Sequence, residues 1–93
     1  MDNNYSNAGV ARKLPDAVRI ELSEIRDGAK VGGSIPPRRR EGLLVEYQRV
    51  ETKYASKLEN LRHFDSSGVA AAETAIIKIA AEFANSLPRA AAA

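Results

Sequence analysis

Residues 43–61, which read LLVEYQRVETKYASKLENL, decide the fold of this chain. Large side chains recur in this stretch at alternating spacings of four and three residues, in the series Leu43, Tyr47, Val50, Tyr54, Lys57 and Leu61. Side chains at these spacings share one face of a helix and form a seam like that of a coiled coil. Lys57 interrupts the seam, but Leu58 lies beside it. We therefore expect a long helix over about residues 37–63.

Two further segments have the same helical periodicity. The first places its apolar side chains at Leu14, Val18, Leu22, Ile25 and Ala29. The second places them at Val69, Ala72, Ile76, Ala80, Phe83 and Leu87. Proline is favoured in the first turn of a helix and ends a helix when it follows the last turn. With Pro15 and Pro88 as these boundaries, we expect helices over about residues 15–30 and 67–87.

The connections between these segments are short. Residues 31–37 read VGGSIPP and break the helical pattern. Asp65, Ser66 or Ser67 can cap the last helix by accepting its free backbone N–H groups. We expect an all-α fold: an antiparallel helical hairpin or three-helix bundle, with coiled-coil-like packing. Residues 14–88 form the single domain, between a disordered N-terminal arm at 1–13 and a disordered alanine-rich tail at 89–93.

The composition points to a small core. Of the 93 residues 44% are apolar, and 16 are alanines that bury little surface. The apolar arcs are nevertheless wide, because Leu43–Val45 and Ile76–Ile79 spread over more of a helix than one neighbour covers. Either the first helix of the same chain or another chain must cover the remainder, and we expect both, with self-association or a protein partner on these faces. The candidate partner-binding residues are Leu43, Tyr47, Val50, Tyr54, Leu61, Ile76, Ile77, Ile79 and Phe83.

Arg38, Arg39 and Arg40 form the one concentrated run of charge. They follow two prolines at the start of the expected second helix, where free N–H groups also attract anions. The run is a candidate site for phosphate groups or for an acidic partner surface, and its alternative interpretation is a solvated helix start. The net charge of +2 is small for a nucleic-acid-binding domain.

Sites for chemistry are missing from the sequence. The chain has no cysteine and one histidine, His63, so a thiolate or histidine-rich metal site is excluded. Pairs of carboxylates such as Glu21 and Glu24 alternate with arginines on a polar helix face, which does not provide the dry cleft that acid–base catalysis requires. We predict no catalytic residue, no metal, no cofactor and no small-molecule substrate, and hence no enzyme.

The sequence also bears on location. No stretch is long and apolar enough to span a membrane, and residues 1–7 lack the basic and apolar regions of a secretory signal. Without cysteine, a reducing cytoplasm is the expected compartment, and a leaderless secreted substrate would have the same features.

The order helix, Gly/Pro loop, helix resembles that of small helical-hairpin chaperones and of short phage and plasmid regulators. The resemblance covers the size and the helical pattern only. The leading hypothesis is a non-enzymatic protein-interaction module, such as an adaptor, inhibitor or chaperone-like subunit, that is oligomeric. The alternative is a small nucleic-acid-binding regulator that uses Arg38–Arg40.

Overall fold

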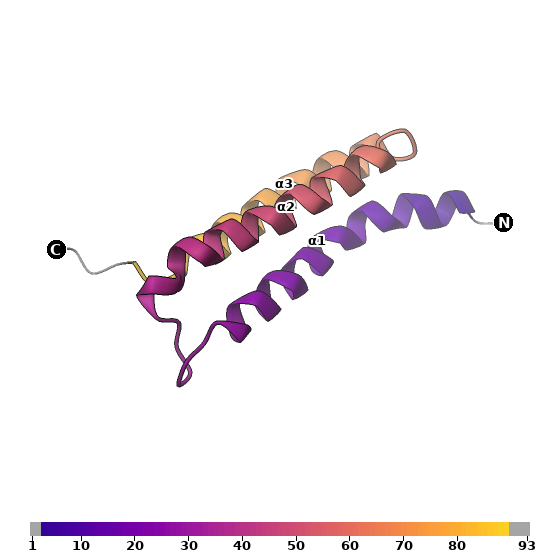
Figure 1. The fold of residues 1–93 in the computed structure, drawn as a ribbon. Coiled ribbons are helices and arrows are strands. Elements are labelled where there is room, and N and C mark those ends of the chain that lie inside the picture. Colours follow the sequence, from indigo (N-terminus) through magenta and orange to yellow (C-terminus); the bar gives the residue numbers. More distant parts are fainter. Residues whose placement is uncertain (1–2, 90–93) are drawn as a thin grey trace.

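The computed structural model describes the backbone of residues 3–89 and the side chains of residues 9–89. Three α-helices follow one another: α1 (Asn3–Gly28), α2 (Arg40–Leu61) and α3 (Ser66–Asn85), with a 3-10 turn η1 (Pro37–Arg39) before α2. All three helices pack against one another along their lengths (Figure 1). The expected all-α three-helix bundle is confirmed.

The start of α1 differs from the expectation. We expected a disordered arm over residues 1–13, but the described backbone is helical from Asn3, so Pro15 lies inside the helix. An internal proline costs a backbone hydrogen bond and clashes with the preceding turn. Packing offsets this cost, because Ala11 is fully buried and Leu14 packs against the core. The apolar stripe thus continues past the proline toward the N-terminus. Residues 1–2 and 90–93 lie outside the described part of the chain.

The connection between α1 and α2 contains a tight turn. The backbone N–H of Val31 donates to the carbonyl of Ser34 at 2.7 Å, and the N–H of Ser34 donates back at 3.3 Å. Both residues between them have positive φ, 61° at Gly32 and 89° at Gly33. Only glycine adopts such values without strain, so these two residues allow the chain to reverse after α1.

The turn between α2 and α3 ends in a helix cap. The carboxylate of Asp65 accepts a hydrogen bond from the backbone N–H of Gly68 at 3.0 Å. Asp65 was one of the three residues expected to cap this helix, and this part of the prediction is confirmed. The cap satisfies one of the free N–H groups at the start of α3.

The core follows the predicted helix faces. All six residues of the predicted stripe from Val69 to Leu87 are buried, although α3 ends at Asn85 and Leu87 follows it. On α2 the series Leu43, Tyr47, Val50 and Tyr54 is buried as expected. Leu58 continues it in place of the exposed Lys57. Among residues 9–89 no charged side chain is buried, so apolar contacts hold the helices together.

Candidate interaction surface

Most residues predicted to bind a partner instead form the chain's own core. Seven of the nine are at most 7% exposed: Leu43, Tyr47, Val50, Tyr54, Ile76, Ile79 and Phe83. They are covered because α1 packs across the hairpin of α2 and α3. We therefore correct the expectation at these seven positions, which offer no free surface. Leu61 is half-buried, and Ile77 remains 61% exposed.

Polar contacts fix the side of the hairpin that α1 covers. On α1, Glu21 lies with one carboxylate oxygen 2.8 Å from the Nζ of Lys53, and its other oxygen accepts a hydrogen bond from the hydroxyl of Tyr54. The hydrogen bond from Lys53, followed by that from Tyr54, lowers the pKa of Glu21. In turn the hydrogen bond to Glu21, with a smaller effect of burial, raises the pKa of Tyr54 to about 12. These contacts join α1 to α2.

A second contact joins α1 to α3. The guanidinium carbon of Arg26 lies 5.2 Å from the centre of the Phe83 ring, which is a cation–π distance. The Phe83 ring also meets that of Tyr47 edge-on, with centroids 5.9 Å apart and the planes at 79°. The side of the hairpin that carries Lys53, Tyr54 and Phe83 is therefore occupied by α1.

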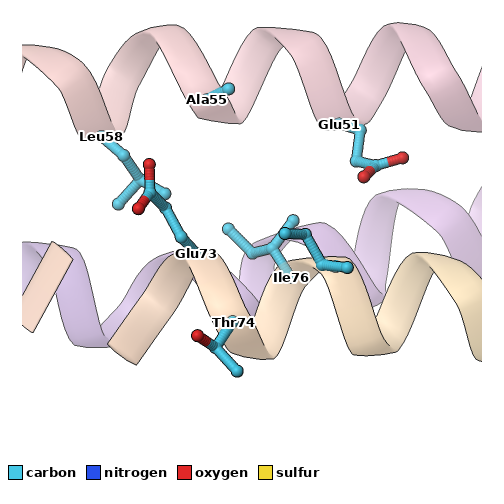
Figure 2. A pocket seen from close by; sticks show the side chains of 7 residues that line it. Glu51, Ala55, Leu58, Glu73, Thr74 and Ile76 are labelled. Atoms are coloured by element: carbon cyan, nitrogen blue, oxygen red, sulfur yellow. The ribbon is translucent and has the colours of Figure 1, made fainter. Parts of the chain in front are cut away.

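The opposite side of the hairpin has no helix on it within the described chain. Ala55 lies two residues after Lys53, which is about 160° around α2 at 3.6 residues per turn. Ala81 lies two residues before Phe83, about 160° around α3 by the same geometry. Figure 2 shows this side in close-up, with the α1 ribbon behind the hairpin. We call this surface the open face; its residues are Leu44, Val45, Gln48, Arg49, Glu51, Thr52 and Ala55 of α2 and Glu73, Thr74, Ile77, Ala81 and Ala84 of α3.

Two hollows follow the groove between α2 and α3 on the open face. The first, of about 410 Å³, is lined by Ala55, Leu58 and Thr74 among others. In Figure 2 the side chains of α2 and α3 approach each other across it. The second, of about 380 Å³, lies toward Leu44 and Ala84. Ile77 and Glu51 line both hollows, so they separate one from the other.

Each helix contributes a short uncharged row to the open face, with Arg49 and Glu59 of α2 at its borders. On α2 the row is Val45, Gln48, Thr52 and Ala55, and on α3 it is Thr74, Ile77, Ala81 and Ala84. Residues spaced three and four apart form a helix-packing seam, and small side chains allow a second helix to come close. The sequence reasoning missed these rows. The signal that could have found them is an uncharged row of alternating threes and fours on the side of each helix away from its apolar seam.

Two carboxylates border the groove. Glu73 is paired with Arg62, whose guanidinium nitrogen lies 2.9 Å from its Oε2. Glu51 is half-buried and makes no ion pair with any residue from 9 to 89. The groove is thus apolar at its floor and carries one unpaired negative charge.

The arginine run lies at the other end of the bundle from Arg12 in the N-terminal part of α1. Arg38 and Arg39 are exposed in η1, and Arg40 is half-buried at the start of α2. The N-terminal part of α1 lies near the α2–α3 turn, at the other end of the bundle from η1 (Figure 1), and Arg12 belongs to this part of the helix. From Arg12 to Gly28 at the end of α1 is about 24 Å at 1.5 Å per residue. The arginine run and Arg12 therefore do not form one patch.

The described part of the chain was also searched for clusters of metal-binding side chains. Within residues 3–89 no group of three or more potential metal ligands lies together. His63 lies exposed in the turn after α2. In this same range no helix has the length and apolar character that crossing a bilayer requires.

Comparison of the chain with protein-family models, with curated proteins and with solved structures finds no match.

Proposed function

We propose that this protein is a non-enzymatic protein-interaction module that acts through the open face of α2 and α3. The observation that carries the proposal is a groove bordered by two uncharged helix rows, with Ile77 61% exposed between two hollows. Contiguous apolar surface of this kind marks interaction sites more reliably than single exposed apolar residues do. The roles it suits are those of a small adaptor, inhibitor or chaperone-like subunit.

The compartment we propose is the cytoplasm. The chain contains no cysteine and so needs no oxidising environment for its fold.

Site-specific crosslinking tests this function in the cells that express the protein. A photo-reactive amino acid is placed at Thr52 on the open face, and in a matched control at Glu24 on the outer side of α1. Both positions are exposed and lie on helices. We expect crosslinked protein, either another chain or a second copy, from position 52 and not from position 24. Equal yields from the two positions would contradict the proposal.

A second candidate function rests on the exposed arginines of η1. Arg38, Arg39 and Arg40 stand together in the sequence, and the first two are solvent-exposed in the structure. Lysine and arginine side chains that neutralise phosphates give binding that weakens with salt, by about 0.9 log units per phosphate for each decade of salt on duplex DNA. We therefore propose nucleic-acid binding as the alternative.

Fluorescence anisotropy with labelled duplex DNA tests the alternative. Replacing Arg38, Arg39 and Arg40 by alanine should abolish the salt-dependent binding. Replacing Arg12, Lys13 and Arg19 on α1 removes the same number of positive charges and should leave it largely unchanged. If both triple variants weaken binding equally, the run has no specific role, and if the unmodified protein does not bind at low salt, the alternative is excluded.

A further inference from the structure

We infer that the end of the bundle at η1 binds the phosphate backbone of duplex nucleic acid without reading its sequence. This inference rests on the second candidate function. It extends the binding site from the arginine run to Lys30 and Arg89, which the sequence alone does not bring together with the run. We call this surface the basic end; it comprises residues 26–41 and 85–89.

Three segments of the chain meet at the basic end. α3 runs back from the α2–α3 turn alongside α2, so α3 ends where η1 and α2 begin (Figure 1). α2 has 22 residues and α3 has 20, so their outer ends differ by about 3 Å at 1.5 Å per residue. Leu87 is buried and holds the segment after α3 against the core, and the exposed Arg89 follows two residues later. Lys30 belongs to the third segment, because it lies in the short connection between α1 and η1.

The basic end is strongly positive, although the chain as a whole is not. It contains six basic and two acidic residues, a net charge of +4, whereas the whole sequence has +2 and the remaining residues therefore sum to −2. One of the two carboxylates, that of Asp27, already pairs with Arg26 and Lys30 at 3.2 Å each. A surface of one sign attracts polyanions and orients the molecule toward them. The basic residues are Arg26, Lys30, Arg38, Arg39, Arg40 and Arg89, and the acidic ones are Asp27 and Glu41.

The side chains of the basic end fit a duplex better than other anionic partners. A guanidinium presents a planar fork that binds phosphate oxygens in pairs, and Arg38, Arg39 and Arg89 are exposed. The basic end contains no aromatic residue on which the bases of a single strand could stack. Its one exposed large apolar residue is Val31, which is too little for the apolar anchor of a protein interface or for insertion into a membrane.

The placement of the arginines favours binding without base recognition. Arg38 and Arg39 lie in η1, and Arg89 lies after the end of α3. A protein that reads base edges usually inserts an α-helix or a β-ribbon into the major groove. These three arginines lie outside the α-helices, so we expect them to contact phosphates only.

Fluorescence anisotropy on the full chain, measured as a function of salt, tests the inference. The probes are labelled duplexes of two unrelated sequences and a labelled single strand of the same length. Arg89→Ala should reduce the slope of log affinity against log salt by about 0.9, and so weaken duplex binding about eightfold at about 0.1 M salt. The matched control is Arg12→Ala, which removes an exposed arginine near the other end of the bundle and should leave the slope unchanged. Circular dichroism checks that both variants keep their helices.

A variant of the opposite charge change complements this test. Glu41 is exposed in the first turn of α2, next to the arginine run, and its carboxylate repels phosphate. Glu41→Gln should therefore strengthen duplex binding, whereas Asp16→Asn, at an exposed position in α1, should not. Weaker binding by Glu41→Gln would contradict the inference.

The results separate the inference from the function on which it rests. If the triple alanine variant of the arginine run loses binding but Arg89→Ala and Arg12→Ala behave alike, the second candidate function stands and the inference is wrong. Tighter binding to the single strand, or a preference of more than about tenfold for one duplex sequence, would also overturn the inference. If the unmodified protein does not bind duplex at low salt, both fail, and binding to phosphatidylserine vesicles in that case would assign the basic end to a membrane surface.

Discussion

Ile20 on α1 and Ile77 on α3 are almost equally exposed, at 60% and 61%, but their surroundings differ. On α1 the helical neighbours of Ile20 include the carboxylates of Asp16 and Glu24. On α3 the neighbours of Ile77 include Thr74 and Ala81 and one carboxylate, Glu73, which is paired with Arg62 at 2.9 Å. A single exposed apolar residue among unpaired charges is ordinary protein surface, whereas an apolar residue between two hollows is the feature on which the proposed interaction surface rests. Exposure alone therefore does not distinguish the two positions; the surroundings of each side chain do.

The largest expected effect is on the free energy of unfolding, and it tests whether α1 packs against the hairpin through one side only. Leu22 is fully buried, two residues from the exposed Ile20. Replacing Leu22 by alanine should lower the free energy of unfolding by about 3 kcal/mol, because it leaves a cavity under α1. Replacing Ile20 by alanine should change it by less than about 0.5 kcal/mol. Urea denaturation followed by circular dichroism measures both, and similar losses would show that α1 is not docked as described.

An intermediate effect is expected at the contact that directs α1 to one side of the hairpin. Replacing Glu21 by glutamine removes the charge that holds Lys53 and Tyr54, and should lower the free energy of unfolding by about 1 kcal/mol at neutral pH. The contribution also depends on pH. Since the folded pKa of Glu21 is lowered, its stabilisation is present above the ordinary value of 4.5 and is lost as the pH falls through the folded pKa.

At alkaline pH the Tyr54 hydroxyl gives the unfolding free energy a pH dependence of the opposite sign. Its pKa rises from 10.0 to about 12 in the folded protein, mainly through its hydrogen bond to Glu21. The corresponding stabilisation is present below pH 10.0 and is lost as the pH rises through about 12. Unfolding free energies measured across both ranges should therefore vary less with pH in the Glu21→Gln variant. Identical pH profiles for the variant and the unmodified protein would contradict the described contact.

The last comparison concerns two tyrosines on the same buried side of α2. Tyr54 donates its hydroxyl hydrogen to Glu21, whereas the buried hydroxyl of Tyr47 has no hydrogen-bond partner within the described part of the chain. Tyr54→Phe should lower the unfolding free energy by about 1 kcal/mol. Tyr47→Phe should leave it unchanged or raise it by up to about 1 kcal/mol, because an unpaired buried hydroxyl is costly. Equal losses in thermal or urea denaturation would show that the Tyr47 hydroxyl is bonded.

The helix faces could be predicted from the sequence because a period of 3.6 residues fixes the direction of each side chain around its helix. The α3 stripe from Val69 to Leu87 is buried in full, and on α2 the one change is Leu58 in place of Lys57. The predicted start of the first helix at residue 15 was wrong, because Pro15 was given more weight than the apolar series that continues to Ala11. Tertiary packing overrides the low helix propensity of a residue such as proline when the packing is strong enough.

The candidate surface was harder to predict, for a geometric reason. Periodicity gives the apolar arc of each helix but not which of the two grooves of a hairpin the third helix fills. The sequence therefore assigned Tyr54 and Phe83 to a partner, although α1 covers them through Glu21 and Arg26. Of the predicted partner-binding residues, Ile77 is exposed and lies between two hollows. This follows from how the three helices are arranged in space, which the sequence pattern does not give.

The cap at the start of α3 has a consequence for how the chain can change over evolution. A Cβ atom added to Gly68 would lie 2.0 Å from Oδ2 of Asp65, so the Asp65 carboxylate must shift to admit a larger residue at position 68. The backbone of Gly68 is helical, and alanine is favoured over glycine there by about 1 kcal/mol once the space is free. An aspartate cap tolerates a side chain three residues later, as the capping box shows, so the chain can exchange Gly68 for alanine, gain helix stability and keep its cap.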